Sequence, residues 1–138
     1  MYPSMRVVIA LCVCLNTPQI VISRTLDHVD SLIQQLRNPD PVMRVRAVGE
    51  LSILGDLRAV EPLIETLRND KDDLVRLCAA KEMWRLGDHR AVEPLIAALN
   101  DENNEVQVNA MASLGELKDP GAIGPIVAQL KSSQWQNR

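Results

Sequence analysis

Few side chains in this sequence could carry out chemistry, and their spacing does not bring them together. The two histidines, His28 and His89, have no second histidine or cysteine three or four residues away, where one turn of a helix would place two ligands side by side. Cys78 has no histidine near it in sequence that could activate its thiol. We therefore expect no metal site and no cofactor, and we expect Cys78 to be buried and inert.

The remaining polar features indicate structure rather than catalysis. Asp70, Asp72 and Asp73 precede an apolar periodic segment, where acidic side chains cap helices. The six glycines are isolated and form no phosphate-binding loop. The formal net charge is −3, whereas nucleic-acid binding requires a basic patch. The sequence therefore predicts a protein without catalytic activity that does not bind nucleic acid.

A ten-residue segment that recurs along the chain organises the rest of the sequence. Its copies are RAVEPLIETL at 58–67, RAVEPLIAAL at 90–99, the weaker GAIGPIVAQL at 121–130 and the divergent DHVDSLIQQL at 27–36. The last three copies in chain order are 32 and then 31 residues apart. A fixed period in this range is typical of a protein built from stacked repeats.

Each copy belongs to a predicted pair of short helices. Thr25 is the expected N-cap of the first helix, and Asp40 followed by Pro41 is a favourable start for the second. Gly55 and Gly87 are expected to end second helices in the left-handed conformation. The apolar spacing places one set of side chains inward, namely Val29, Leu32, Ile33, Leu36, Met43, Ala47, Leu51, Leu54, Val60, Leu63, Ile64, Leu67, Val75, Ala79, Met83, Leu86, Val106, Ala110, Leu114 and Leu117.

A single helical pair cannot bury both of its faces, so the pairs must stack. We expect residues 25–132 to form an all-α, right-handed α-solenoid of about three and a half two-helix repeats, followed by a polar tail at 133–138. Residues 1–24 lie outside the repeat and contain a short apolar run, VVIALCVCL. This run is too short to span a membrane, and it is expected to be either a cap on the first repeat or a secretory signal peptide.

The repeat resembles a known family. Leu54-Gly55-Asp56 leads into the segment 58–63, and a V-R-x-x-A helix, Val75-Arg76 with Ala79, follows it. This pattern is similar to the short HEAT-like repeat of the phycobilin-lyase type. The resemblance implies that the protein is a bilin lyase, a scaffold or adaptor protein, or deoxyhypusine hydroxylase. The last of these uses His-Glu pairs to hold iron. Here His28 precedes Val29 and His89 precedes Arg90, so the pairs are absent and this enzyme is not supported.

One face of the second helices carries a row of apolar residues that point away from the expected core. The row consists of Val45, Val48, Leu77, Trp84, Val108 and Met111, with Arg44, Arg76 and Lys81 as a possible polar rim. In a solenoid this face is expected to be concave, and an exposed apolar patch usually marks an interaction site. The alternative is that curvature or the N-terminal segment buries the row.

These observations favour a binding module over an enzyme. We expect a scaffold or adaptor that recognises a protein or peptide on its concave face, with Trp84 as an anchor and no catalysis of its own. The alternative is a phycobilin lyase-like subunit or a chromophore-handling chaperone. The expected location is cytoplasmic, unless residues 1–23 act as a signal peptide for export.

Overall fold

Every secondary-structure element in the described part of the chain is a helix. The computed structural model describes the backbone of residues 18–132 and the side chains of residues 27–132. The α-helices are α2 (Pro18–Gln35), α3 (Pro41–Leu54), α4 (Val60–Asn69), α5 (Asp73–Glu82), α6 (Val92–Ala98), α7 (Asn104–Leu117) and α8 (Ile123–Lys131). Four short 3-10 helices lie between them, η1 (Leu57–Ala59), η2 (Met83–Leu86), η3 (His89–Ala91) and η4 (Pro120–Ala122). The predicted all-α fold is confirmed.

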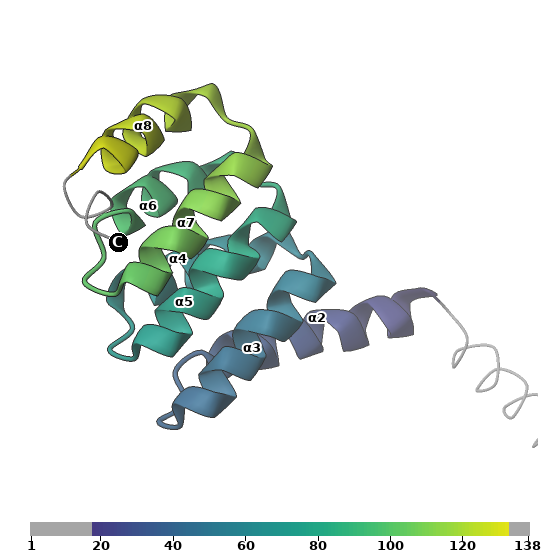
Figure 1. Cartoon of the computed structure of the whole chain (residues 1–138). Coiled ribbons are helices and arrows are strands. Elements are labelled where there is room, and N and C mark those ends of the chain that lie inside the picture. Colours follow the sequence, from purple (N-terminus) through teal and green to yellow (C-terminus); the bar gives the residue numbers. More distant parts are fainter. Residues whose placement is uncertain (1–17, 133–138) are drawn as a thin grey trace, which may run out of the picture.

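The helices form two layers. Helices α3, α5 and α7 lie side by side in one layer, and α4 and α6 pack behind α5 and α7 (Figure 1). Helix α2 packs on α3, and α8 lies at the far end of the stack. Contacts within the layer of α3, α5 and α7 are more extensive than the contact between α4 and α6. The arrangement explains the sequence period, because each repeat places one helix in each layer.

The helix ends follow the predicted capping chemistry. Asp40, Asp72 and Asn103 each accept a hydrogen bond from the backbone N–H two residues on, at the starts of α3, α5 and α7. Gly55 and Gly87 have positive φ angles of 66° and 61°, as expected where the chain leaves a second helix.

The first helix of each later repeat begins with a 3-10 turn. Asp56, Asp88 and Asp119 each accept a hydrogen bond from the backbone N–H two residues on at the start of η1, η3 and η4. Pro62 and its counterparts then fall in the first turn of the α-helix, where a missing amide costs no intrahelical hydrogen bond. The chain therefore enters α4 through the tight turn η1.

Three details differ from the sequence prediction. Helix α2 begins at Pro18, so Thr25 lies inside the helix and does not cap it. Helix α5 ends at Glu82 and continues as the 3-10 helix η2, rather than remaining α-helical to Leu86. Leu54 is exposed rather than inward, because it is the last residue of α3 and lies beside the turn at Gly55.

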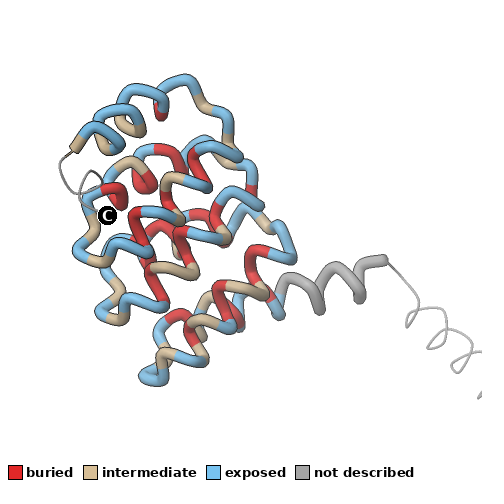
Figure 2. The backbone as a smooth tube through the Cα atoms, in the orientation of Figure 1, coloured by how far each residue is buried: buried red, intermediate tan, exposed pale blue. Residues whose placement is uncertain are grey.

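The core runs between the two layers. Buried positions, red in Figure 2, occur on every helix from the C-terminal half of α2 to α7. Ala47, Ala79 and Ala110 lie at equivalent points of α3, α5 and α7 and are almost completely buried. Because an alanine side chain is small, it lets the neighbouring helices approach closely, as the spacing of these residues predicts.

Buried polar side chains join one repeat to the next. Nε and Nη2 of Arg44 each donate to Asp70 of the following repeat at 2.8 Å, and Nη1 donates to the Asn38 carbonyl of its own repeat at 2.8 Å. Arg76 repeats this pattern with Asp101 and the Asp70 carbonyl. The hydrogen bond to Asp70 raises the pKa of Arg44 above its usual value.

The third member of this series is Gln107. Its amide nitrogen donates to the Asp101 carbonyl of its own repeat at 2.6 Å, as the two arginines do in theirs. The position equivalent to Asp70 and Asp101 is occupied here by Ser132, so no carboxylate is available for an arginine. A neutral side chain avoids burying an unpaired charge, which would be costly.

Two of the predictions lie outside the described residues. The apolar segment at 1–24, with Cys12 and Cys14, lies outside the described residues except for the backbone of residues 18–24. The polar tail at 133–138 lies outside them completely. In the described region, no helix is long and apolar enough to cross a membrane.

Candidate interaction surface

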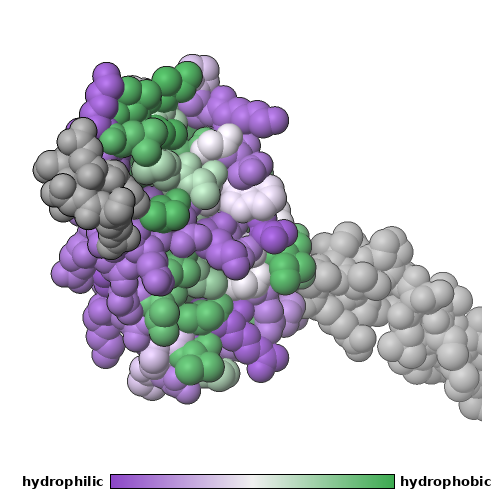
Figure 3. Space-filling view, in the orientation of Figure 1, coloured by the Kyte–Doolittle hydropathy of each residue, from purple (hydrophilic) through white to green (hydrophobic). Residues whose placement is uncertain are grey.

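The outward side of α3, α5 and α7 carries exposed apolar residues in register. We define the second-helix face by Val42, Val45, Leu74, Leu77, Val108 and Met111. Val42 and Leu74 are the most exposed, at 69% and 61%, and Val108 is 46% exposed. Figure 3 views this side of the molecule and shows hydrophobic residues over α3 and α5, with a second hydrophobic area over α8. Over α3 and α5 the face is therefore apolar, and Val42, Leu74 and Val108 are its solvent-exposed members.

A groove lies between α3 and α5. It is lined by Val42, Val45, Leu74 and Leu77, together with Pro41, Asp72, Cys78 and Lys81. The groove has a volume of about 380 Å³, and most of its lining surface is apolar. Its walls come from equivalent positions of successive repeats, because Val42 corresponds to Leu74 and Val45 to Leu77. The groove is thus a consequence of the repeat itself.

The next groove, between α5 and α7, has a different chemistry. It shares Leu74 with the first groove and adds Val108, but its other lining residues are polar, namely Asp73, Asn103, Asn104, Glu105 and Asn109. Glu105 is the counterpart of Val42 and Leu74 in α7. The second-helix face therefore changes from apolar to acidic as it passes from α3 to α7.

The structure brings together only part of the predicted apolar row. Val45, Leu77, Val108 and Met111 lie on the second-helix face, with Val45, Leu77 and Met111 half-buried. Val48 does not, because it is fully buried in the core. Inclusion of Val48 in an exposed row was wrong, since α3 packs this position against its neighbours.

Two of the three expected rim residues are also corrected. Arg44 and Arg76 are 5% and 6% exposed, because their guanidinium groups are held between repeats by Asp70 and Asp101. They stabilise the stack and cannot form a polar rim. Lys81 is exposed and lines the groove between α3 and α5.

Trp84 lies beyond both grooves, in η2, and lines neither of them. It is 37% exposed, and the Arg85 guanidinium lies 5.1 Å from the centre of its ring. Its counterparts are Ser52 and Gly115, both much smaller. Ser52 is buried, whereas Trp84 lies partly in solvent.

Cys78 lines the groove and is half-buried rather than fully buried. Burial, with a smaller contribution from the charge of Glu82, raises the pKa of its thiol. The thiol is therefore protonated at neutral pH and a poor nucleophile. Among the described side chains, histidine, cysteine, aspartate and glutamate form no group of three that could hold a metal ion.

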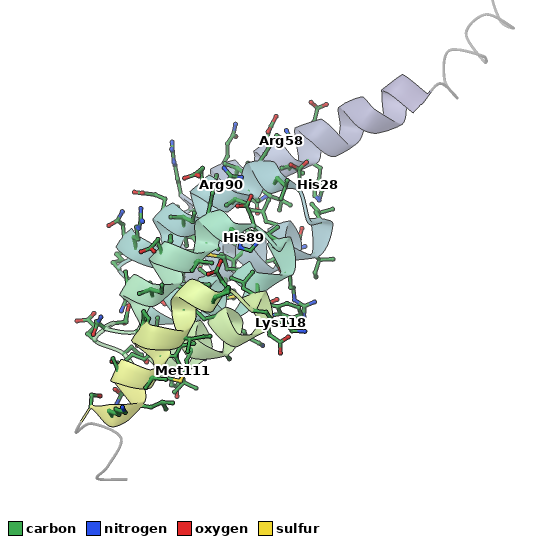
Figure 4. All side chains as sticks on the ribbon, turned by 90° about the horizontal axis from the view of Figure 1, so that it is seen from above. His28, Arg58, His89, Arg90, Met111 and Lys118 are labelled. Carbon is green, nitrogen blue, oxygen red and sulfur yellow. The ribbon has the colours of Figure 1, made fainter. Side chains whose placement is uncertain are left out.

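A second set of contacts runs along the loop edge of the stack. Arg58 donates to Asp30 at 2.8 Å, Arg90 donates to Glu61 at 3.1 Å, and His89 Nδ1 lies 3.0 Å from Asp119. Figure 4 shows Arg58, Arg90 and Lys118 in order from the α2 end towards the α8 end. His89 is exposed, and its contact with Asp119 joins neighbouring repeats.

The helix pairs, the spacing of the buried alanines and the links between repeats describe one structural unit used several times. The sequence matches the family of HEAT repeats over residues 5–81 and again over residues 60–138. The chain belongs to the HEAT repeat family. HEAT repeats commonly serve as protein-interaction scaffolds and are generally not catalytic. No curated protein matches this chain.

The sequence contained a signal for the grooves that helical periodicity alone missed. The direction of each side chain around a single helix axis selects Leu77 and Val108. Val42 and Leu74 lie in the first turn of their helices, where residues are usually considered for their role in capping. Comparing equivalent positions between HEAT repeats would have found both, because Val42 and Leu74 are large apolar residues where α7 has Glu105.

Proposed function

We propose that this protein is an interaction module that binds a protein or peptide across the second-helix face and has no catalysis of its own. The observation that carries the proposal is the open apolar groove between α3 and α5, whose most exposed apolar residues are Val42 and Leu74. Large aliphatic side chains exposed in register, within a concave lining, are typical of surfaces that bind partners.

We further infer that the second-helix face is the concave side of a right-handed solenoid of about three and a half repeats. The more extensive contacts among α3, α5 and α7 than between α4 and α6 support this, because the helices of the inner layer of a curved stack contact each other more. Trp84 would extend the contact beyond the grooves as an anchor, because tryptophan is enriched among interface hot spots.

The phycobilin-lyase subtype of the repeat is also a proposal, and it implies a different activity. Incubation with a bilin and an apo-phycobiliprotein tests it directly. A covalent adduct that forms only when this protein is present would replace the binding-module proposal with a chromophore-handling one.

The interaction proposal is tested by selecting ligands from a displayed library of random peptides on the immobilised full-length chain. Each selected peptide is then measured against the wild-type protein and the variants Leu74→Ser and Val108→Ser. We expect the selected peptides to lose at least about tenfold in affinity with one or both variants. A selection that yields no peptide sensitive to either variant would overturn the proposed site.

A further inference from the structure

We propose that the second-helix face recognises an extended peptide segment that carries an apolar side chain and, about three residues away, a basic side chain. This inference rests on the proposed function and adds the chemistry of the partner. It is drawn from the change in character between two neighbouring grooves that share Leu74.

The apolar half of the recognition comes from the groove between α3 and α5. Val42, Val45, Leu74 and Leu77 form its walls, and the lining surface is almost entirely apolar. Covering this surface removes apolar area from water, which favours binding in proportion to that area. An aliphatic side chain such as leucine would bury itself there without leaving a polar group unpaired.

The basic half comes from the groove between α5 and α7. Its carboxylates are those of Asp73 and Glu105, both exposed, and neither forms an ion pair with any of the described side chains. Asp73 accepts a hydrogen bond from Asn103 at 2.6 Å, which holds its carboxylate at the groove wall. An arginine or lysine in this groove would complement both carboxylates.

The spacing of the two grooves fixes the spacing in the partner. Packed neighbouring helices lie about 8–10 Å apart. A chain in the extended polyproline II conformation advances about 3.1 Å per residue and has three residues per turn, so side chains three residues apart point the same way. One step from groove to groove therefore corresponds to about three residues. A partner helix, with a diameter of about 10–12 Å, is wider than one such step, so an extended segment fits the two grooves better.

The test uses two fluorescein-labelled peptides, Ser-Thr-Leu-Ser-Thr-Arg-Ser-Thr and its reversed sequence, titrated with the full-length protein by fluorescence anisotropy. We expect one of the two orientations to bind. Replacing its arginine with glutamate should weaken binding about tenfold or more, and so should replacing its leucine with serine.

Protein variants locate the site. The double variant Asp73→Asn/Glu105→Gln should weaken binding of the arginine peptide about fivefold or more, while leaving binding of the same peptide with glutamine in place of arginine unchanged. The matched control is Glu93→Gln/Glu116→Gln, which removes two exposed carboxylates outside the grooves. The control should have no effect, and circular dichroism should show that both variants are folded.

The outcomes separate this inference from the proposed function. Equal binding of the arginine and glutamate peptides, or no binding in either orientation, would overturn the inference. If the random-peptide selection then still gave ligands sensitive to Leu74→Ser, the interaction module would stand with a partner of different chemistry. If it gave none, both would fail.

Discussion

Arg44 and Asp70 form a buried bidentate ion pair across the junction between two repeats, with both nitrogen–oxygen distances at 2.8 Å. The two side chains are only 6% and 8% exposed. The same guanidinium group holds the turn of its own repeat through the Asn38 carbonyl. One side chain thus closes a turn and fixes the position of the following repeat, and Arg76 does the same one repeat later.

The first prediction is that Asp70→Ala destabilises the protein by about 3–5 kcal/mol, because it leaves the buried guanidinium of Arg44 without its counter-charge. Adding Arg44→Met should recover a large part of this loss, since the uncompensated charge is then removed. Urea unfolding followed by circular dichroism measures both. A loss below about 1 kcal/mol for Asp70→Ala, comparable to the exposed control Glu93→Ala, would contradict the structural role of the pair.

The second prediction concerns the member of the series that is not charged. Gln107→Arg should cost about 1–3 kcal/mol, because Ser132 cannot supply the carboxylate that pairs with Arg44 and Arg76 in their repeats. Adding Ser132→Asp should recover stability. If Gln107→Arg alone stabilises the protein in thermal unfolding, the arginine must find another partner, and the explanation given for the glutamine is wrong.

The extent to which the fold could be predicted is clear from this series. The period of 32 and 31 residues and the capping residues Asp40, Asp72 and Asn103 are local features, so they predicted the helices and their order. The pairing of Arg44 with Asp70 joins residues 26 positions apart. Helical periodicity on one helix cannot reveal such a contact, so both arginines were assigned to the surface.

The candidate site was predictable to a smaller extent for a related reason. Direction around a helix axis tells which residues point away from the core, and it selected Val108, which is 46% exposed, and Leu77, which is half-buried and packs against the core. This direction does not tell how closely the neighbouring helices pack, and their packing buries Val48 completely. Grooves depend on pairs of neighbouring helices, so Val42 and Leu74 became evident only from the packed structure.

The third prediction concerns Lys118, which has a φ angle of 53° where the earlier repeats have glycine. Lys118→Gly should stabilise the protein by up to about 1 kcal/mol, because glycine adopts this left-handed conformation without the steric cost of a side chain. Gly87→Ala should destabilise by a similar amount for the opposite reason. Thermal unfolding measures both, and a lower melting temperature for Lys118→Gly would show that the lysine side chain contributes more than its backbone strain costs.

The fourth prediction concerns acid stability. The Arg90 side chain, followed by its backbone N–H, lowers the pKa of Asp88 in the folded protein. A carboxylate with a lowered folded pKa contributes stability that is complete above its unfolded pKa of about 3.9 and is lost as the pH falls towards the folded pKa. Asp88→Asn keeps the cap but removes the charge, so its stability should depend less steeply on pH below about 4.

The measurement is the free energy of unfolding between pH 2.5 and 7 for the wild type and Asp88→Asn, with Asp27→Asn as a control for an exposed aspartate. We expect the difference between wild type and Asp88→Asn to be largest near neutral pH and to shrink below about pH 4. A difference that stays constant over the whole range would show that the charge of Asp88 does not contribute.

The last prediction separates binding from folding on the second-helix face. Leu74→Ser should change the free energy of unfolding by no more than about 0.5 kcal/mol, because the side chain is 61% exposed. Trp84→Ala should cost more than Leu74→Ser, because the 37% exposed residue loses the buried contacts of its ring as well as the contact with Arg85. Leu77→Ser should cost more stability than Leu74→Ser, because Leu77 packs against the core.

Leu74→Ser and Trp84→Ala should each weaken partner binding by about 2 kcal/mol if both residues contact the partner. Binding lost in Leu74→Ser but kept in Trp84→Ala would confine the interface to the grooves. A large drop in melting temperature for Leu74→Ser would instead show that the residue belongs to the core, and the groove could not be a binding site.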